Sequence, residues 1–468
     1  MKYSPTIGLE IHIELKTNSK MFCSCKNDPF IKKPNIYICP ICLGLPGTLP
    51  VLNKKAIEWT VLVALSLQCK IASETKWDRK NYYYPDLPKG YQISQYDLPL
   101  SSNGVLEIDF DGELLPVGIE RVHLEEDTAK LIHPKGTNYS LVDFNRAGIP
   151  LMEIVTKPDM HSARQAQKFA KDLQHILRYV GVSDADMEKG QMRIEANISI
   201  SKDDKLGTKV EIKNLNSFRS VEKAIEYEIS RQSKVLTEGG TILQETRGWN
   251  QDKQETFSQR SKEFAPDYRY FPEPDLPPLK VGKDWLAELK SQIPLLPAQK
   301  RQKFFQKYKL SLEMVEILIS DKNLTSYFEK VLGLKGYKIS PKTLANWMVH
   351  KNLKTKMVPE KLAGFLSFLE KGVISESMGR EITLEMIKTN KSIDQILKEK
   401  GLKLMEDEKQ LERVIDGVLK ANQKVVLDFK KGKQAAFHFL IGQVMRKTSG
   451  LANPKLVNRV LREKLSRL

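Results

Sequence analysis

The sequence predicts an α+β protein with a mixed, largely antiparallel sheet cradle with helices, followed by an all-helical domain and a small helical tail. In residues 7–15 every second side chain is apolar, which is the pattern of a half-buried strand. In residues 161–180 apolar side chains recur at helical spacing. Helical patterns follow residue 295, and 468 residues are too many for one core. We therefore expect three domains, at 1–295, 296–405 and 406–468.

The polar face of the first strand carries potential chemistry. Gly8, Glu10, His12 and Glu14 alternate with the apolar residues. A carboxylate and an imidazole on one face are typical of a divalent-metal site or an acid/base site. The alternative is a half-buried strand whose polar face meets only solvent, and later segments with matching side chains favour the first interpretation.

Composition limits the class of protein. With 41% hydrophobic residues the chain can build large cores, and its longest apolar run, near residues 61–67, is far too short to span a membrane. The first residues lead directly into the first strand without a signal or transit peptide. We therefore expect a cytoplasmic protein that has no membrane contact.

The basic charge is confined to the C-terminal part. Residues 1–295 hold 40 Lys and Arg against 40 Asp and Glu, whereas residues 296–468 hold 35 against 18, which gives the whole net charge of +17. Such a block indicates a polyanionic partner, and nucleic acid is the first candidate. The alternative, a surface that is lysine-rich everywhere, disagrees with the neutral first part.

Four of the five cysteines are clustered. They form a C-x-C pair, Cys23 and Cys25, and a C-x-x-C pair, Cys39 and Cys42. Two such pairs separated by a loop are typical of one tetrahedral Zn(II) site. Four thiolates close the shell of the metal, so we expect a structural zinc, whereas Cys69 follows an apolar helical run and is expected in the core.

The N-terminal part continues with a helix at 56–67 and a rigid loop at 77–96, rich in Tyr, Pro and Gly. That loop is either a phosphate- and base-binding segment or an aromatic-packed loop with exposed lysines. A β-meander is expected over 103–133. It and the following strand-like run, 140–156, place Glu125 and Glu153 among apolar neighbours, and buried carboxylates brought together require a cation.

After the helix at 161–180, strands are expected at 192–200 and 208–219, with alternating charged or amide side chains, and then a helix at 221–231. The polar set of these strands resembles the floor of a nucleotide–metal site more than a solvated face. The proline-rich stretch 267–278 is expected to form a stiff strap without regular structure.

Several long motifs resemble the family of B subunits of the tRNA-dependent amidotransferases. They are residues 7–12, 20–23, 39–44, 79–82, 84–95, 143–146, 151–156, 213–218 and 267–278, and the tail signature 442–454. The resemblance covers the chain from the first strand to the C-terminus. The sequence departs from the family pattern at Ile194, where cysteine is usual, at Glu195, where aspartate is usual, and at Lys157, where an acid is common.

The resemblance implies an ATP-dependent reaction. ATP phosphorylates the side-chain carboxylate of misacylated Glu-tRNA(Gln) and/or Asp-tRNA(Asn), because a carboxylate oxygen is a poor leaving group, and ammonia then displaces the phosphate. The resemblance further implies an Mg(II) site of Glu10, His12, Glu125 and Glu153. His12 either ligates the ion or only positions groups, since Mg(II) prefers oxygen. Contacts to ATP are assigned to Lys80, Lys213, Asn214, Asn216, Ser217 and Arg247.

The resemblance also implies partners. The sequence has no Gly/Ser-rich nucleophile loop for a glutaminase and no Walker-type loop for ATP. Ammonia must therefore come from the A-type glutaminase partner, within a heterotrimer of the family's A, B and C subunits. A different hypothesis is a non-catalytic adaptor that binds zinc and tRNA, and the acidic residues of the first domain argue against it.

The C-terminal part is expected to begin with a linker at 285–300 and to be helical from there. Helices are predicted at 297–308, 311–319, 324–332, 340–350, 359–371, 375–389 and 392–400, with a second small helical module over 408–468. A tRNA-binding surface is predicted from Lys430, Lys431, Lys433, Arg446, Lys447, Lys455 and Arg459. For any single lysine a solvated face is the alternative.

Overall fold

The computed structural model describes residues 3–203, 205–261, 268–349, 353, 356–399, 408–430, 432–448, 452 and 454–467. The chain forms two compact units, Met1–Pro297 and Ala298–Leu468. The first unit holds one hydrophobic core, and the second holds two separate clusters of buried apolar residues. The boundaries near residues 295 and 405 stay a prediction.

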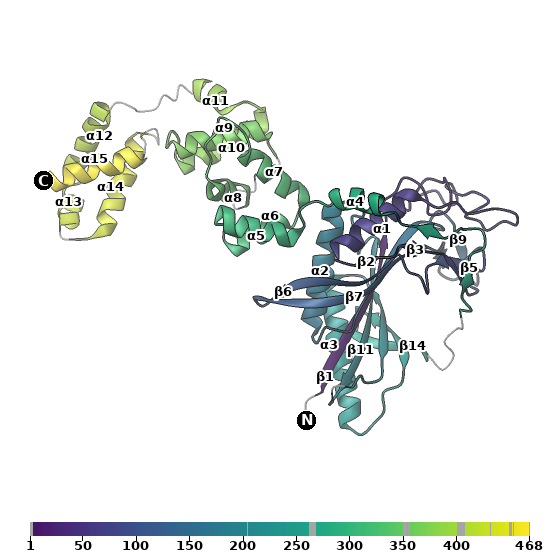
Figure 1. Cartoon of the computed structure of the whole chain (residues 1–468). Coiled ribbons are helices and arrows are strands. Elements are labelled where there is room, and N and C mark those ends of the chain that lie inside the picture. Colours follow the sequence, from purple (N-terminus) through teal and green to yellow (C-terminus); the bar gives the residue numbers. More distant parts are fainter. Residues whose placement is uncertain are drawn as a thin grey trace. The chain divides into compact units, whose positions relative to one another are not determined.

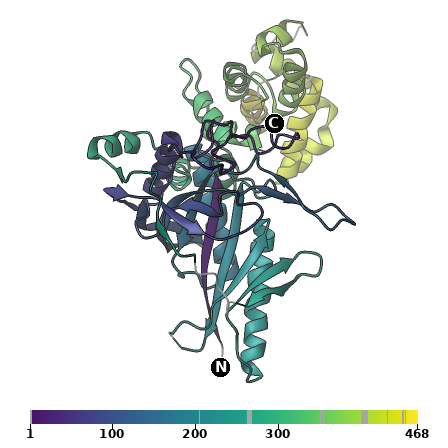
Figure 2. The ribbon, with the colours of Figure 1, turned by 90° about the vertical axis from the view of Figure 1, so that its right-hand side faces the viewer.

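A sheet of nine strands forms the first unit, in the order β14-β13-β12-β11-β1-β10-β7-β6-β2 (Figures 1 and 2). Its strands are β1 (Ser4–Glu14), β2 (Lys70–Ile71), β6 (Ser101–Phe110), β7 (Glu113–Glu126), β10 (Pro150–Thr156), β11 (Met192–Ser201), β12 (Val210–Leu215), β13 (Glu245–Asn250) and β14 (Glu255–Ser261). All neighbours are antiparallel except β12 and β13, which are parallel. The predicted fold class is confirmed.

The alternating strand β1 lies at the centre of this sheet, drawn in purple in Figure 2. Its apolar side chains are buried in a core shared with helices α1 (Lys54–Ser66), α2 (Ala163–Val180) and α3 (Phe218–Thr237). Helix α2 begins after Ser162, whose side chain accepts a hydrogen bond from the backbone N–H of Gln165, and ends at Gly181 in the left-handed conformation. One face of the sheet is therefore apolar and covered by helices, and the other presents the polar residues of β1.

A smaller sheet contributes to the site on the polar face. It consists of β4 (Asp78–Asn81), β5 (Tyr91–Ser94) and β15 (Phe271–Pro272), and β5 contacts β7. The expectation of no regular structure in the proline-rich strap was wrong at β15. Both of its residues pair with β4, and β15 lies at the edge of this sheet, where proline is tolerated. Asp267, at the start of the strap motif, lies outside the described residues.

Smaller pairs complete the unit. Strand β3 (Glu74–Thr75) pairs with β16 (Leu279–Lys280), and β8 (Lys130–Ile132) pairs with β9 (Leu141–Asp143). Helix α4 (Lys283–Ser291) lies within the segment predicted as a linker, so that prediction was wrong there: α4 buries Leu289 and contacts α1.

The second unit is helical throughout the residues that the structure describes. Its helices are α5 (Pro297–Tyr308), α6 (Leu312–Ile319), α7 (Lys322–Leu332), α8 (Pro341–Val349), α9 (Pro359–Glu370), α10 (Glu376–Thr389), α11 (Ile393–Glu399), α12 (Glu408–Ala421), α13 (Gln423–Lys430), α14 (Gln434–Lys447) and α15 (Pro454–Arg467). A capping box begins α11: the Gln395 N–H donates to Ser392 Oγ, and the Ser392 N–H donates to Gln395 Oε1 at 2.8 Å. In the described parts of both units, every helix is too short or too polar to cross a membrane.

Candidate active site and metal centre

A cleft of about 530 Å³ lies over the polar face of the nine-stranded sheet. Strands β1, β7, β10, β11 and β12 contribute to its lining, and further lining residues come from β4, β5 and the segment 268–270. The polar side chains of the first strand therefore line a concave surface. The carboxylates of later segments, such as Glu125 and Glu153, had favoured this interpretation of the strand.

The centre of the cleft holds two carboxylates between two imidazoles. His12 Nε2 lies 3.5 Å from Glu125 Oε1 and 3.6 Å from Glu153 Oε2, and His123 Nε2 lies 3.1 Å from the same Glu153 oxygen. Strand register explains why His12, Glu153 and His123 lie side by side. Glu153 on β10 is paired with His12 on β1 and with His123 on β7. One ligand atom from each of His12, Glu125 and Glu153 lies within 4.8 Å of the other two.

Charge is strongly coupled at this centre. Burial lowers the pKa of His12, but the carboxylates of Glu153 and Glu125 outweigh it and raise that pKa to about 9. Burial raises the pKa of Glu153, but the two imidazoles hold it well below its usual range. The two imidazoles therefore favour the ionised form of Glu153.

Glu10 belongs to a second cluster. The structure groups it with Glu195 and Glu211, again within 4.8 Å, and apart from the cluster of His12. Lys213 Nζ lies 2.9 Å from Glu195 Oε2 and 3.4 Å from Glu211 Oε1, so a lysine already neutralises part of this cluster. Burial raises the pKa of Glu195. The four residues assigned to one Mg(II) site are thus divided between two neighbouring groups.

Lys80 reaches the cleft from β4. Its Nζ lies 5.0 Å from the centre of the Tyr268 ring. Burial lowers its pKa, but the charges of Glu125 and Glu153 outweigh this and raise that pKa above its usual value. Lys80 is therefore a fixed cation beside the carboxylates.

The polar cleft residues that the sequence analysis did not assign to the site include Arg121, His123, Asp127 and Arg193. Arg193 Nη2 donates to Asp127 Oδ1 at 3.0 Å. Three of these four had a visible signal: Arg121 and His123 alternate with apolar residues in phase with Glu125, and Arg193 does so in phase with Glu195. The pairing of Asp127 with Arg193 joins strands far apart in the chain and has no local signal.

The structure does not bring four of the residues assigned to ATP into the cleft lining. Asn214 and Asn216 are exposed, and Ser217 is the N-cap of α3, where its side chain accepts from the Ser220 N–H. Arg247 lies in register with the buried Ile212, so it faces the helices. There its guanidinium donates to Glu245 Oε1 at 2.6 Å and to the Thr256 hydroxyl at 2.8 Å.

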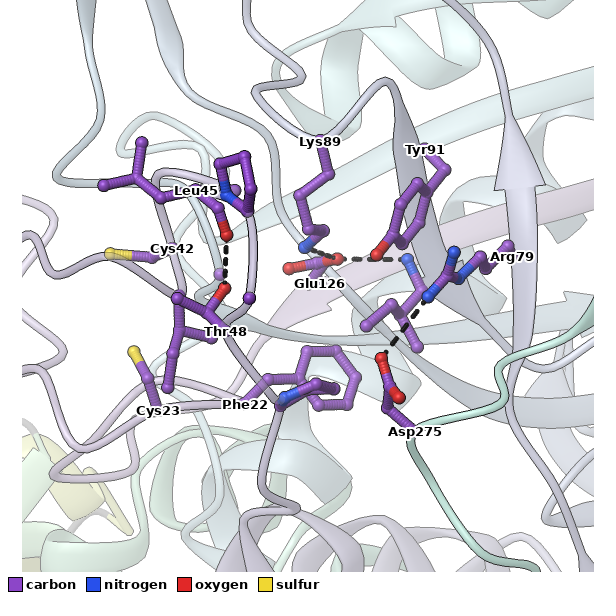
Figure 3. A pocket seen from close by; sticks show the side chains of 17 residues that line it. Phe22, Cys23, Cys42, Leu45, Thr48, Arg79, Lys89, Tyr91, Glu126 and Asp275 are labelled. Carbon is purple, nitrogen blue, oxygen red and sulfur yellow. Dashed lines mark hydrogen bonds and ion pairs between the residues drawn. The ribbon is translucent and has the colours of Figure 1, made fainter.

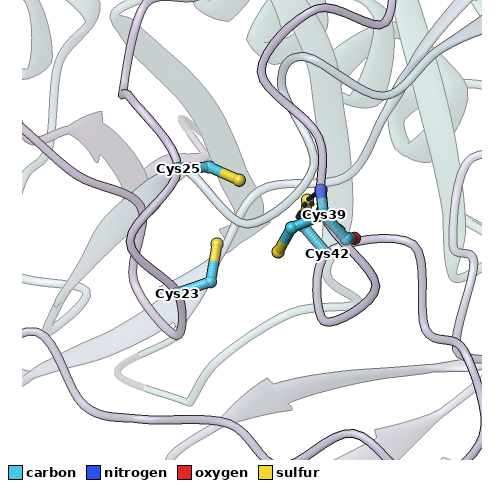
Figure 4. A group of neighbouring side chains, drawn as sticks. All are labelled: Cys23, Cys25, Cys39 and Cys42. Carbon is cyan, nitrogen blue, oxygen red and sulfur yellow. Dashed lines mark hydrogen bonds between the residues drawn. The ribbon is translucent and has the colours of Figure 1, made fainter.

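The four clustered cysteines come together (Figure 4). All four sulfur atoms lie within 4.8 Å of one another, and those of Cys39 and Cys42 are 3.9 Å apart. A tetrahedral Zn(II) with bonds of 2.3 Å places its sulfurs about 3.8 Å apart. A hydrogen bond from Cys23 is the main cause that lowers the pKa of Cys42 to about 5, and the Cys39 N–H and the charge of Lys20 lower it further. The donor set and its spacing fit Zn(II).

A smaller pocket of about 240 Å³ lies beside the cysteines (Figure 3). Lys89 binds Glu126 at its wall, and Arg79 is bound by Glu273 at 2.7 Å and approached by Asp275 at 3.5 Å. The cations of this pocket are therefore already paired, and the pocket shares no lining residue with the cleft.

The residues assigned to tRNA lie on helices of the C-terminal module. Lys430, Lys433, Arg446, Lys447 and Arg459 are exposed. Lys433 Nζ lies 3.0 Å from Asp428 Oδ1. Lys431 and the side chain of Lys455 lie outside the described residues. These residues would be exposed both on a phosphate-binding surface and on a face that meets only solvent. Their exposure therefore does not distinguish the two, and tRNA binding stays a prediction.

Comparison with known proteins identifies the family. Residues 5–287 match the family described as the GatB/GatE catalytic domain, and residues 326–465 match the GatB domain. The chain belongs to the family of B subunits of aspartyl/glutamyl-tRNA(Asn/Gln) amidotransferases. Proteins of that name from Carboxydothermus hydrogenoformans and Thermoanaerobacter pseudethanolicus are 47% and 48% identical to it, with both chains covered completely. The Persephonella marina protein is 47% identical over 99% of this chain and 100% of its own.

The predicted family and enzyme class, a tRNA-dependent amidotransferase, are thereby confirmed. The match to the GatB/GatE catalytic domain covers the strands of the first unit from the second residue of β1 onward, and it includes every residue that lines the cleft and the four cysteines. The GatB domain spans the helices from α8 to α14 and most of α7 and α15, and hence the basic residues assigned to tRNA.

Proposed function

We propose that this protein phosphorylates the side-chain carboxylate of misacylated Glu-tRNA(Gln) and/or Asp-tRNA(Asn) with ATP and then amidates it with ammonia. The cleft carries this proposal, because it combines the carboxylates of Glu125 and Glu153 with the fixed cation Lys80. Phosphoryl transfer needs chiefly the positioning of reactants and the neutralisation of charge. An adaptor would not need to bury two carboxylates such as Glu125 and Glu153, which costs free energy unless it serves binding.

The residues of the cleft have separable roles. Lys80 would face the phosphates or the substrate carboxylate, since its ammonium is held charged beside Glu125. His12 and His123 hold Glu153 ionised, and Asp127 orients the guanidinium of Arg193 at the wall of the cleft.

The donor set also fits Mg(II). Glu125 and Glu153 offer the carboxylate oxygens that this ion prefers, with His12 as a weaker ligand or an orienting group. The group of Glu10, Glu195 and Glu211 is less suited, because Lys213 already supplies positive charge there. When bound, Mg(II) would supply neutralisation of the phosphate charge.

Partners follow from the same reaction. The ammonia would come from the A-type glutaminase partner, in a heterotrimer that also holds the family's C-type partner. The tRNA body would contact the basic residues of the C-terminal module. Zn(II) would hold the two cysteine loops together. We place the reaction in the cytoplasm, where aminoacyl-tRNA is made.

The test is tRNA-dependent turnover of [γ-32P]ATP by the complete complex. Glu125→Gln keeps the shape of the side chain and removes its charge, so turnover should fall by about 100-fold or more while tRNA binding is retained. Glu113→Gln, at the exposed start of the same strand, is the matched control and should be as active as the wild type. Full activity of Glu125→Gln would refute the assignment of this site and favour the adaptor.

A further inference from the structure

One short segment, residues 142–148, contacts both the cysteine loop and the wall of the cleft. It runs from the end of β9 to the turn before β10. The cysteine loop, residues 23–42, carries one pair of cysteines at each end (Figure 4). Zn(II) would join the two ends of this loop, so its middle, residues 33–37, needs another support.

Asn145 gives that support from the segment. Its side chain is buried, and its Oδ1 accepts from the backbone N–H of Ile36 at 2.8 Å and from that of Tyr37 at 2.9 Å. Its Nδ2 donates to the Lys33 carbonyl at 2.9 Å. The loop has no regular structure here, so this one amide satisfies three backbone groups that would otherwise need water. The segment therefore fixes the course of the loop, and the loop fixes the segment.

Arg146, the next residue, binds the sheet. Its guanidinium forms an ion pair with Glu14 on β1 and donates to Asp127 Oδ2 at 2.6 Å. The Gly148 N–H adds a hydrogen bond to the Asp127 carbonyl at 2.9 Å. Asp127 in turn accepts two hydrogen bonds from Arg193, of 3.0 and 3.4 Å. The segment thus holds the carboxylate that orients Arg193.

Arg193 stands beside the carboxylate centre. On β11 it is paired with His12, which is paired on its other side with Glu153. Its side chain is 39% exposed and lines the cleft, whereas Arg146 is not among the lining residues. A long arginine side chain keeps many conformations unless its partners fix it. Arg146 can therefore affect the cleft only through Asp127.

The buried charges of this network are a poor device for stability alone. Apolar side chains of similar size often stabilise a fold as well as a buried ion pair does. Glu14 is buried, yet its Oε2 accepts no hydrogen bond from the residues that the structure describes. Such a group is better suited to holding a neighbouring side chain in one orientation than to adding stability.

We propose that Asn145 and Arg146 are positioning residues that couple the cysteine loop to the cleft. Asn145 fixes the segment against a loop that Zn(II) would close, and Arg146 holds Asp127 so that Arg193 keeps one direction. This inference rests on the proposed function, because the reaction is placed in the cleft. Loss of zinc should therefore slow the reaction although no cleft residue is changed.

The first experiment measures kcat and KM of tRNA-dependent ATP turnover by the complete complex. Asn145→Ala removes the three hydrogen bonds to the loop and leaves every cysteine and cleft residue in place. Its kcat should fall about tenfold or more, because small displacements of a positioned group slow a reaction, while the KM for Glu-tRNA(Gln) stays within about twofold. The matched control is Asp28→Asn, which breaks an ion pair of 3.0 Å with Lys26 in the same loop and should keep the wild-type kcat.

A double substitution tests whether the zinc site and Asn145 act along one path. Cys42→Ser, which should lose the zinc, is expected to lower kcat by a similar factor. Adding Asn145→Ala to it should change kcat little further, because the effects of groups in one network are not additive. If the two effects multiply fully, they are independent and the inference is wrong.

Amide hydrogen exchange of the wild-type complex covers the case in which a variant does not fold. Zinc is removed with the chelator TPEN in excess Mg(II), and exchange is compared before and after. Faster exchange is expected in residues 33–42 and also in the peptides that contain Asp127 and Gly148, whose N–H groups bond across the segment. Faster exchange in the loop alone would overturn the inference.

The outcomes separate this inference from the proposed function. If wild type turns over ATP and Asn145→Ala is equally active, the coupling is wrong and the proposed function stands. If wild type turns over no ATP, the proposed function fails, and hydrogen exchange at Asp127 still decides whether the loop and the cleft are coupled.

Discussion

Replacing Asp127 by Asn removes a buried negative charge that binds two arginines. The Asp127 side chain is 6% exposed. It accepts from Arg193 at 3.0 Å and from Arg146 at 2.6 Å, and Arg146 also binds Glu14. Asparagine has nearly the same shape but removes the counter-charge of Arg193 and leaves Arg146 with Glu14 as its carboxylate partner, so the effect should be electrostatic.

The expected loss of folding stability follows from the pKa of Asp127 and from the usual free-energy cost of breaking a buried ion pair. Burial raises the pKa of Asp127, but the two arginines outweigh it and lower that pKa from 3.8 to about 2. At about 1.4 kcal/mol per pKa unit this lowering corresponds to about 2–3 kcal/mol. Breaking a buried ion pair costs about 3–5 kcal/mol. We therefore expect Asp127→Asn to lower the free energy of unfolding of the first unit by about 2–5 kcal/mol.

Urea unfolding of the full-length chain, followed by the fluorescence of the buried Trp77 and Trp249, measures this change. Asp111→Asn is the matched control, because it breaks an exposed pair with Arg164 and should cost less than about 1 kcal/mol. Equal effects of the two substitutions would refute the reasoning.

The pH dependence gives a second check on Asp127. Its folded pKa lies below the ordinary value, so its contribution is present above about pH 4 and is lost as the pH falls towards 2. The difference between wild type and Asp127→Asn should therefore shrink as the pH falls below about 4. A difference that stays the same down to pH 2 would contradict this assignment.

Two further predictions concern the zinc and the tail. Wild type should contain about one Zn(II) per chain by elemental analysis, and Cys42→Ser should lose it and become more sensitive to protease near the cysteines, whereas Cys69→Ser should keep it. Zinc at equal content in both variants would contradict the site. Removal of residues 409–468 should weaken tRNA binding and flatten its salt dependence while the first unit stays folded, and an unchanged salt titration would contradict the predicted role of the tail.

Much of the local structure was predictable because it depends on short-range patterns. The β-meander predicted over 103–133 contains Asp111-Gly112, a dipeptide typical of tight hairpins, and both residues have positive φ, of 54° and 90°, at the turn between β6 and β7. Helix α3 extends to Thr237, beyond the predicted end at residue 231. Its end was missed because the buried position after residue 231 is occupied by the polar Gln232, which interrupts the apolar stripe.

Residues around the site were harder to place because the face of the sheet on which a side chain lies depends on how its strand pairs with the neighbouring strands. Asn214 has a φ of 67° next to an irregularity in the β11–β12 pairing, so the alternation of β12 does not continue through it. Arg247 carries the same charge that a phosphate site needs, yet the parallel pairing of β13 turns it to the helices. Neither fact can be read from neighbouring residues.

The sequence by itself determined the central strand, the cysteine site and the family, since side-chain alternation, ligand spacing and long motifs are properties of contiguous residues. Only the tertiary structure decided that Glu153 stands between His12 and His123 and that Glu10 joins Glu195 and Glu211. These groupings arise where strands distant in the chain pair in one register, and a shift of one residue would turn each side chain to the other face.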